Sequence, residues 1–260
     1  MDAASGVVTG VAAGTAVITA TCDGRTATAT INVRPRPTAS WNQTADWATY
    51  QGNASHTGYV DATLDPVSFR ERWVTSVAAG VVLNPVTEGG GSVFASVQSY
   101  FGAQKAAVLD AATGAVRWSH DFGNIHGVHP PSYANGRMYL TTSGHEDSFL
   151  WSFDAGTGAV LFRSAYGNQW STYYAPVVLD GSVYMAGGSY GGMYRFGASD
   201  GAQQWFAGTN QYDGWTPAVR DGIVYAYTGS YSPKVSAVKP GLARSRSKSP
   251  TQVSAGTGGR

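Results

Sequence analysis

The chain has 260 residues, of which 43% are apolar, 12% aromatic and only 13% charged, and its formal net charge at pH 7 is +1. This composition can fill a large core, while the weak charge argues against nucleic acid or an anionic membrane as the main partner. The single cysteine, Cys22, excludes an internal disulfide framework. Because no segment keeps a helical periodicity, we expect an all-β protein with no inserted membrane segment.

Residues 5–33 predict a β-hairpin, because apolar and polar side chains alternate on both sides of the turn pair Asp23-Gly24. The segment reads SGVVTGVAAGTAVITATCDGRTATATINV and resembles the closing strands of bacterial Ig-like group 2 domains. We therefore assign residues 1–33 to the C-terminal fragment of such a domain. The start lacks a basic region followed by a continuous apolar run, so we expect an exported parent protein that begins further upstream.

Residues 34–45 begin with RPRPT and predict a stiff linker. The lead-in segment that follows, residues 46–60, reads DWATYQGNASHTGYV. It resembles the start of secreted propellers that are built from pyrroloquinoline-quinone-type repeats, and the resemblance extends to about residue 239. It implies a propeller fold and a location in the secreted fraction or on the cell surface.

A repeat of 43 to 45 residues separates the closing positions Trp73, Trp118, Phe162 and Trp205. The segments that end there read alike: LDPVSFRERW, LDAATGAVRW, FDAGTGAVLF and FGASDGAQQW. A period of this length is typical of one four-stranded propeller blade, which buries its apolar faces only by stacking on its neighbours. Trp118 and Trp205 are therefore expected to pack between blades.

Two kinds of turn divide each repeat. The pairs Asn135-Gly136, Asp180-Gly181 and Asp221-Gly222 predict two-residue hairpins, because these residues accept positive φ. The later pairs Thr113-Gly114, Thr157-Gly158 and Asp200-Gly201 are expected to form equally tight turns. Each repeat then contains four short antiparallel strands.

The strand count predicts a truncated propeller of about four blades within residues 46–240. Residues 64–76 are expected to supply the two outer strands of one blade, three full blades follow, and a last blade starts at Thr216. The missing blades are expected from the same parent chain. Residues 241–260 lack aromatic side chains and predict a disordered basic tail, which we interpret as a solvated tail rather than a nucleic-acid-binding arm.

One rim of the propeller is expected to hold the long loops between blades and between second and third strands. Aromatic side chains beside amides stack on sugar rings or anchor a protein partner, whereas the alternative is that they fill the gaps between blades. The predicted ligand-binding residues are Trp170, Tyr173, Tyr174, Tyr190, Tyr212, Trp215 and Tyr231.

The histidines of the same rim suggest a metal site. His126, His129 and His145 lie in loops that bound one blade, and imidazole is a common ligand for transition metals. The competing interpretation is that they are ordinary loop histidines, since their spacing lacks the helical pattern of metalloproteases.

The resemblance to quinoprotein dehydrogenases implies a cofactor held by an adjacent Cys-Cys disulfide, a stacking Trp, a calcium-binding acid set and a catalytic Asp. Cys22 alone cannot form that disulfide, so no cofactor is expected. We predict a non-catalytic scaffold that binds carbohydrate, or a cell-surface protein as second choice. The alternative is an enzyme, either a quinone-dependent oxidoreductase or a polysaccharide-degrading propeller that uses Glu146, Asp147 or Asp213.

Overall fold

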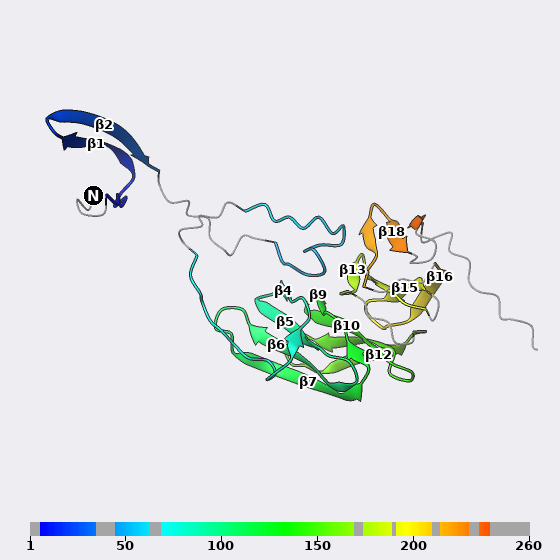
Figure 1. The fold of residues 1–260 in the computed structure, drawn as a ribbon. Coiled ribbons are helices and arrows are strands. Elements are labelled where there is room, and N and C mark those ends of the chain that lie inside the picture. The colour runs from blue at the N-terminus through cyan, green and yellow to red at the C-terminus, as the bar shows by residue number, and fades with distance from the viewer. Residues whose placement is uncertain are drawn as a thin grey trace, which may run out of the picture. The chain divides into compact units, whose positions relative to one another are not determined.

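A computed structural model describes residues 6–34, 45–62, 69–168, 174–188, 191–209, 214–228 and 234–239. The chain divides into two compact units, Met1–Ala45 with Val60–Glu71, and Asp46–Tyr59 with Arg72–Arg260. Every regular element of the described residues is a strand, so the protein is all-β (Figure 1). Within these ranges no helix is long and apolar enough to cross a membrane.

The first unit contains the predicted hairpin. Strands β1 (Gly14–Cys22) and β2 (Arg25–Val33) pair antiparallel from Gly14 opposite Val33 to Cys22 opposite Arg25. The two turn residues have φ values of 48° and 74°, which only Gly, Asn and Asp adopt readily. Most side chains of both strands are exposed.

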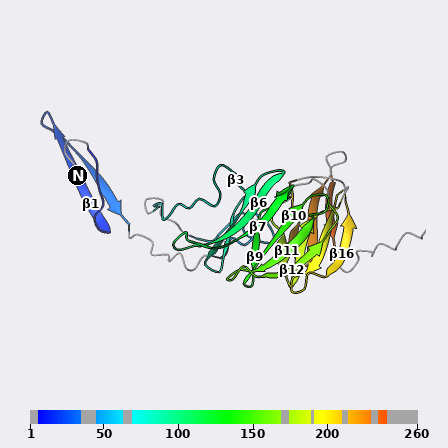
Figure 2. The same cartoon turned by 90° about the horizontal axis from the view of Figure 1, so that it is seen from below.

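The second unit contains four antiparallel sheets, which we number from first to fourth along the chain (Figures 1 and 2). The first comprises β3 (Val82–Leu83), β4 (Thr87–Gly89), β5 (Ser92–Gln98), β6 (Gly102–Asp110) and β7 (Val116–Ile125). The second comprises β8 (Gly127–Val128), β9 (Ser132–Ala134), β10 (Arg137–Ser143), β11 (Phe149–Asp154) and β12 (Val160–Ala165). The third comprises β13 (Val177–Leu179), β14 (Ser182–Ala186), β15 (Gly192–Gly197) and β16 (Gln203–Gly208), and the described part of the fourth comprises β17 (Ala218–Arg220), β18 (Ile223–Thr228) and β19 (Lys234–Val238).

Prolines interrupt the inner strand of the first two sheets. Strands β3 and β4 both pair with β5, on either side of Pro85, and β8 and β9 both pair with β10, on either side of Pro130 and Pro131. Proline has no N–H to donate, so the ladder breaks at these positions. Each of these two sheets is thus a four-stranded blade with a divided inner strand, whereas the third sheet has four undivided strands. The prediction of a partial propeller architecture is confirmed.

The first turn of each repeat has the predicted geometry. Asn135, Asp180 and Asp221 have φ values of 50°, 48° and 52°, and the glycine after each has a φ between 70° and 75°. Positive φ at both positions matches the right-handed twist of the flanking strands. The tight hairpins are therefore confirmed.

The second turn is wider than predicted, because an aspartate rather than a Thr-Gly pair organises it. Asp110 Oδ1 accepts hydrogen bonds from the backbone N–H groups of Ala112 and Thr113 and from the Thr113 hydroxyl, at 2.9 to 3.0 Å. The extra residues are absorbed by an irregularity in the ladder between Val108 and Leu109. Arg117 Nη2 lies 2.6 Å from Asp110 Oδ2, and this bond, with the bonds from Thr113, lowers the pKa of Asp110 to about 2.

Closing tryptophans join successive sheets, as predicted. The Trp118 indole N–H donates to Ala155 O of the second sheet at 2.9 Å, and Trp205 is 7% exposed within the apolar cluster of the third sheet. Phe94, Met138, Leu140 and Phe153 fill the space between the first and second sheets. The core is therefore a series of layers between sheets (Figure 2).

Candidate binding site on the loop rim

The lead-in segment runs along the inner strands of the first two sheets. The backbone N–H of Glu88 in β4 donates to Trp47 O at 2.9 Å, and the N–H of Tyr133 in β9 donates to Ala48 O at 2.8 Å. The segment has no regular strand of its own beyond the bridge at Trp47. Its place is set by backbone groups of the propeller.

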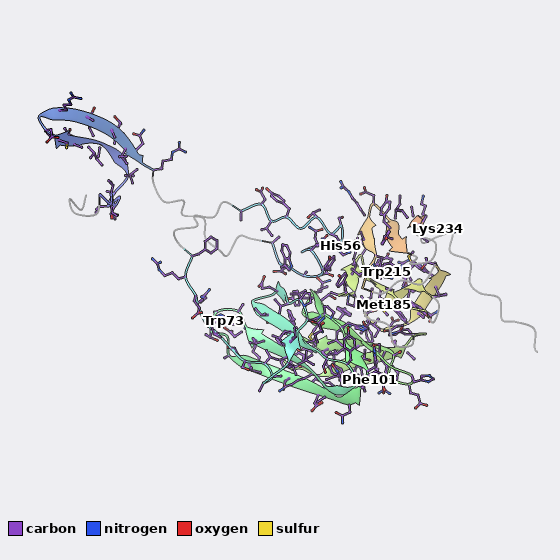
Figure 3. All side chains as sticks on the ribbon, in the orientation of Figure 1. His56, Trp73, Phe101, Met185, Trp215 and Lys234 are labelled. Carbon is purple, nitrogen blue, oxygen red and sulfur yellow. The ribbon has the colours of Figure 1, made fainter. Side chains whose placement is uncertain are left out.

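The same segment continues onto the third and fourth sheets. The buried Thr49 hydroxyl donates to Pro176 O at 2.8 Å, and Val219 N donates to Ala54 O at 2.7 Å. The His56 Nε2 atom lies 3.0 Å from Pro217 O, beside the fourth sheet (Figure 3). One short stretch thus contacts the inner strand region of all four sheets.

Two neighbouring pockets lie beside the lead-in segment, and Pro85 and Pro130 line both. The loop pocket, of about 80 Å³, is lined by Asn84, Pro85, Gln98, Ser99, Tyr100, Gly127, Val128, His129, Pro130, Tyr174 and Gly214. The lead-in pocket, of about 200 Å³, is lined by Trp47, Thr49, Tyr50, Gln51, Pro85, Val86, Thr87, Pro130 and Ala175.

Two tyrosines connect the pockets. The rings of Tyr50 and Tyr174 stack with centroids 4.3 Å apart and an angle of 3° between their planes. Tyr174 N also donates to Trp215 O at 3.3 Å, which ties the loop before β13 to the loop before β17. The stack is thus held from two sides, by the lead-in segment and by the neighbouring blade.

Amides and histidines position the loops of the rim. Asn84 Nδ2 lies 2.9 Å from each of Ser96 Oγ, Val97 O and Val128 O, so one side chain joins the first sheet to the second. His129 is buried, and its Nδ1 atom lies 2.7 Å from Thr141 Oγ1. Asn84 and His129 both line the loop pocket, so these bonds fix part of its wall.

His126 supports the loop that carries the exposed aromatics. Its Nδ1 atom lies 2.9 Å from Ser143 Oγ, and the Phe101 ring packs edge-on against the imidazole at 4.9 Å. The Phe101 N–H donates to His126 O at 3.0 Å. Tyr100 and Phe101 remain 57% and 69% exposed, so they are presented to solvent from a fixed base.

Aromatic, amide and proline side chains make up much of the lining of the two pockets. Among the described residues that line them there is no Asp, Glu, Lys or Arg. The carboxylates of Asp46 and Glu88 each lie one residue along the chain from a lining residue, and the pKa of Glu88 is raised by burial and by the Asp46 carboxylate. The lining therefore favours a neutral ligand with both apolar and hydrogen-bonding surface.

The predicted ligand-binding residues divide into three groups. Tyr174 lines the loop pocket, whereas Trp215 is 6% exposed and packs in the core between the third and fourth sheets. The remaining five, Trp170, Tyr173, Tyr190, Tyr212 and Tyr231, lie outside the described residues.

The three predicted metal ligands have separate surroundings. His126 and His129 are buried and each contacts a different hydroxyl group, while His145 is exposed. Across the described ranges, no three His, Cys, Asp or Glu side chains are grouped as a metal ion requires.

Sequence reasoning missed Trp47, Tyr50 and Gln51 as pocket residues. The letters DWATYQGN contain the same mixture of rings and amides as the loops, and that composition was the available signal. Its place beside the pocket depends on bonds to sheets that lie tens of residues away in sequence.

Comparison with known proteins gives the family. Residues 41–248 match the family described as outer membrane protein assembly factor BamB, with PQQ_2 repeats. No curated protein matches the chain.

Several solved structures match about 60% of this chain, but the match covers less than half of their own length. BamB from Moraxella catarrhalis is 24% identical over 60% of this chain and 45% of that one, with a TM-score of 0.46. A europium-containing methanol dehydrogenase is 20% identical over 63% and 32%, with a TM-score of 0.48. The quinohemoprotein alcohol dehydrogenase of Comamonas testosteroni is 20% identical over 63% and 27%, with a TM-score of 0.46.

The chain thus spans less than half the length of each of these structures. The family match, in contrast, covers most of the chain and agrees with the repeated blades. The chain belongs to the BamB-type family of PQQ_2 repeat propellers.

Proposed function

We propose that this propeller is a non-catalytic binding scaffold whose loop rim holds a carbohydrate. The observation that supports it is the lining of the two pockets, where tyrosine rings adjoin amide side chains and no charged group of the described chain is present. Location outside the cytoplasm is part of the proposal, because the family description names the outer membrane.

The chemistry of a saccharide fits this lining. A pyranose has one face of C–H groups, which stacks on an aromatic ring, and an edge of hydroxyl groups, which needs donors and acceptors. Tyr100 is 57% exposed beside Gln98, which is also exposed, so ring and amide are available together. Aromatic side chains supply this contact area at a low cost in conformational entropy.

Polysaccharide hydrolysis would need a different set of residues. It uses two carboxyl groups at a fixed separation, one of which has a raised pKa. Neither pocket has a described carboxylate in its lining. Binding without catalysis is therefore the function that the lining favours.

A quinone cofactor does not fit the described lining either. The single cysteine, Cys22, lies in the hairpin of the other unit. The pocket linings therefore contain no disulfide between two adjacent cysteines. They also have no acid set to bind the calcium ion that the resemblance to quinoprotein dehydrogenases implies. We derive no redox step for this chain.

A glycan array with the purified chain would identify the saccharide, and titration calorimetry would give its affinity. Tyr100→Ala is expected to weaken binding about tenfold, which corresponds to about 1.4 kcal/mol, because the stacking surface is lost. Tyr225→Ala is the matched control, since Tyr225 is 40% exposed on the fourth sheet and lines neither pocket. Equal affinity in Tyr100→Ala and wild type would reject this site.

A protein partner is the second candidate. Tyr100 and Phe101 are adjacent and exposed, and their loop is anchored on His126. Large exposed rings on a rigid base are typical anchors of protein interfaces. If no glycan binds on the array, a pull-down with the wild-type chain and with Phe101→Ser tests this alternative. A protein that the wild type retains and Phe101→Ser loses would favour it.

A further inference from the structure

The loop pocket and the lead-in pocket share part of their lining. Pro85 and Pro130 line both, and the stacked rings of Tyr50 and Tyr174 join them, because Tyr50 lines the lead-in pocket and Tyr174 the loop pocket. The volumes of the pockets are about 80 and 200 Å³. Neither reaches the roughly 300 Å³ at which ligand sites usually begin, so a ligand that fills only one of them would be small.

Each pocket combines an aromatic ring with an exposed amide. These are Trp47 and Gln51 in the lead-in pocket, and Tyr100 and Gln98 in the loop pocket. Gln51 and Gln98 are both exposed, and among the described residues neither side-chain amide takes part in a hydrogen bond. Both amides can therefore donate to a ligand and accept from it without losing a bond within the protein.

The Trp47 ring is held in place by its surroundings. Trp47 O accepts the Glu88 N–H at 2.9 Å, and a Cβ atom at Gly52 would lie 3.0 Å from Cε3 of the indole, so the backbone of Gly52 packs directly on the ring. The ring is half-buried and lines the lead-in pocket. Because it is already ordered, little conformational entropy is lost when a sugar ring stacks on it.

The shared lining of the two pockets is open to solvent. Val86 and Tyr100 are 46% and 57% exposed, and Pro85, which lines both pockets, is exposed as well. An enclosed pocket accepts only the end of a chain, whereas an open one lets a chain continue past it on both sides. The lining therefore suits the internal units of a linear polymer.

The charges around the lead-in pocket disfavour an acidic ligand. Asp46 directly precedes Trp47 and Glu88 directly follows Thr87, whereas neither pocket has a Lys or Arg among its described lining residues. A chain of uronic acids would therefore meet like charges and find no guanidinium or ammonium group to pair with. A neutral chain has no such cost.

We infer that the two pockets are consecutive subsites of one site, and that its ligand is a linear, neutral oligosaccharide of more than one sugar unit. This assignment rests on the proposed carbohydrate-binding function and adds the length and the charge of the ligand. One sugar unit lies in the loop pocket against Tyr100, another lies in the lead-in pocket against Trp47, and the chain passes Pro85 between them.

Two independent sites for single sugars would behave differently. They would bind two molecules per protein, with an affinity that does not depend on the length of the ligand. A chain that occupies both pockets binds once per protein, and its second contact is intramolecular, so its affinity exceeds that of either contact alone. Length dependence and stoichiometry therefore separate the two arrangements.

Titration calorimetry with linear oligomers measures both quantities. The probes are glucose, mannose, xylose and N-acetylglucosamine series from the monosaccharide to the hexasaccharide, with a galacturonic acid series as the charged comparison. In the series that binds, we expect one hexasaccharide per protein and an affinity about tenfold or more above that of the monosaccharide. Equal affinity at all lengths, two hexasaccharides per protein, or a preference for the galacturonic acid series would overturn the inference.

Gln51→Gly removes a contact of the lead-in pocket without straining the backbone. Gln51 has a φ of 53°, which glycine adopts more readily, so the loop should keep its shape. The affinity for the hexasaccharide should fall about fivefold, because one hydrogen bond to the ligand is lost. Asp180→Gly is the matched control and should bind as the wild type does, since Asp180 has a φ of 48° in an exposed turn and lines neither pocket.

Trp47→Ala removes the stacking surface of the same pocket. We expect a loss of about tenfold in the affinity for the hexasaccharide. Circular dichroism checks the fold of this variant, because the ring packs on Gly52. If the variant does not fold, Gln51→Gly alone decides the role of the lead-in pocket.

The pattern of losses distinguishes a failure of the two-subsite arrangement from a failure of the proposed function. If Tyr100→Ala weakens hexasaccharide binding and Gln51→Gly does not, the loop pocket alone binds sugar, and the two-subsite arrangement fails while the proposed function stands. If no member of any series binds, the proposed function fails as well. Weakening by both variants, with Asp180→Gly unchanged, is the result that we expect.

Discussion

Gly158 combines a positive φ with close packing on a neighbouring blade. Its φ is 77°, and a Cβ atom there would lie 2.7 Å from the Trp118 ring, whereas Gly181 has a φ of 71° and no neighbour within 4 Å of that position. Gly181→Ala should therefore cost about 1 kcal/mol through φ alone, and Gly158→Ala about 2–3 kcal/mol because Trp118 must also shift. Urea unfolding followed by tryptophan fluorescence measures both. Equal losses would show that the contact with Trp118 contributes nothing.

Single residues were predictable where local backbone chemistry decides the structure. The Asn-Gly and Asp-Gly turns follow from the few residue types that tolerate positive φ, and they appear as expected. The second turn was predicted less well, because the side-chain bonds of Asp110 to Thr113 override the simple two-residue pattern. Trp215 illustrates a further limit of prediction from sequence. The sequence does not distinguish a loop tryptophan that packs in a core from one that faces solvent.

Among the elements, the lead-in segment is held in part by one buried side-chain hydrogen bond. Thr49 is 4% exposed and its hydroxyl donates to Pro176 O at 2.8 Å. Thr49→Val keeps the shape of the side chain but leaves that carbonyl without its donor, so we expect a loss of about 1–3 kcal/mol in the free energy of unfolding of the second unit. Chemical denaturation measures it.

The matched control is Thr15→Val on the exposed hairpin. Thr15 also donates to a side chain, Asn32 Oδ1 at 2.7 Å, but both residues are exposed to water. Water replaces that bond, so we expect the unfolding of the second unit to stay within about 0.5 kcal/mol of wild type. A similar loss in both variants would contradict the role of Thr49.

The strands were easier to predict from the sequence than the site. Each blade repeats its turn signals and its β-branched and aromatic positions, so the period alone indicates the sheets. The lead-in segment has no such period, and Tyr50 reaches Tyr174 only because separate backbone bonds hold it against four sheets. Contacts between residues so distant in sequence leave no local pattern.

Across the whole molecule, stability should be distributed very unevenly between the two units. Strands β1 and β2 form a two-stranded hairpin in which Ile18, Ile31 and Val33 alone are half-buried, and such hairpins are marginal in water. All five residues of β14 are buried between neighbouring sheets, so its amides should open only when the propeller unfolds. Hydrogen exchange followed by mass spectrometry should therefore show the amides of β1 and β2 exchanging orders of magnitude faster than those of β14. Comparable protection of the amides in the hairpin and in β14 would contradict this prediction and would mean that another surface stabilises the hairpin. In that case, a shortened chain that starts at Asp46 would unfold at a lower denaturant concentration than the full chain.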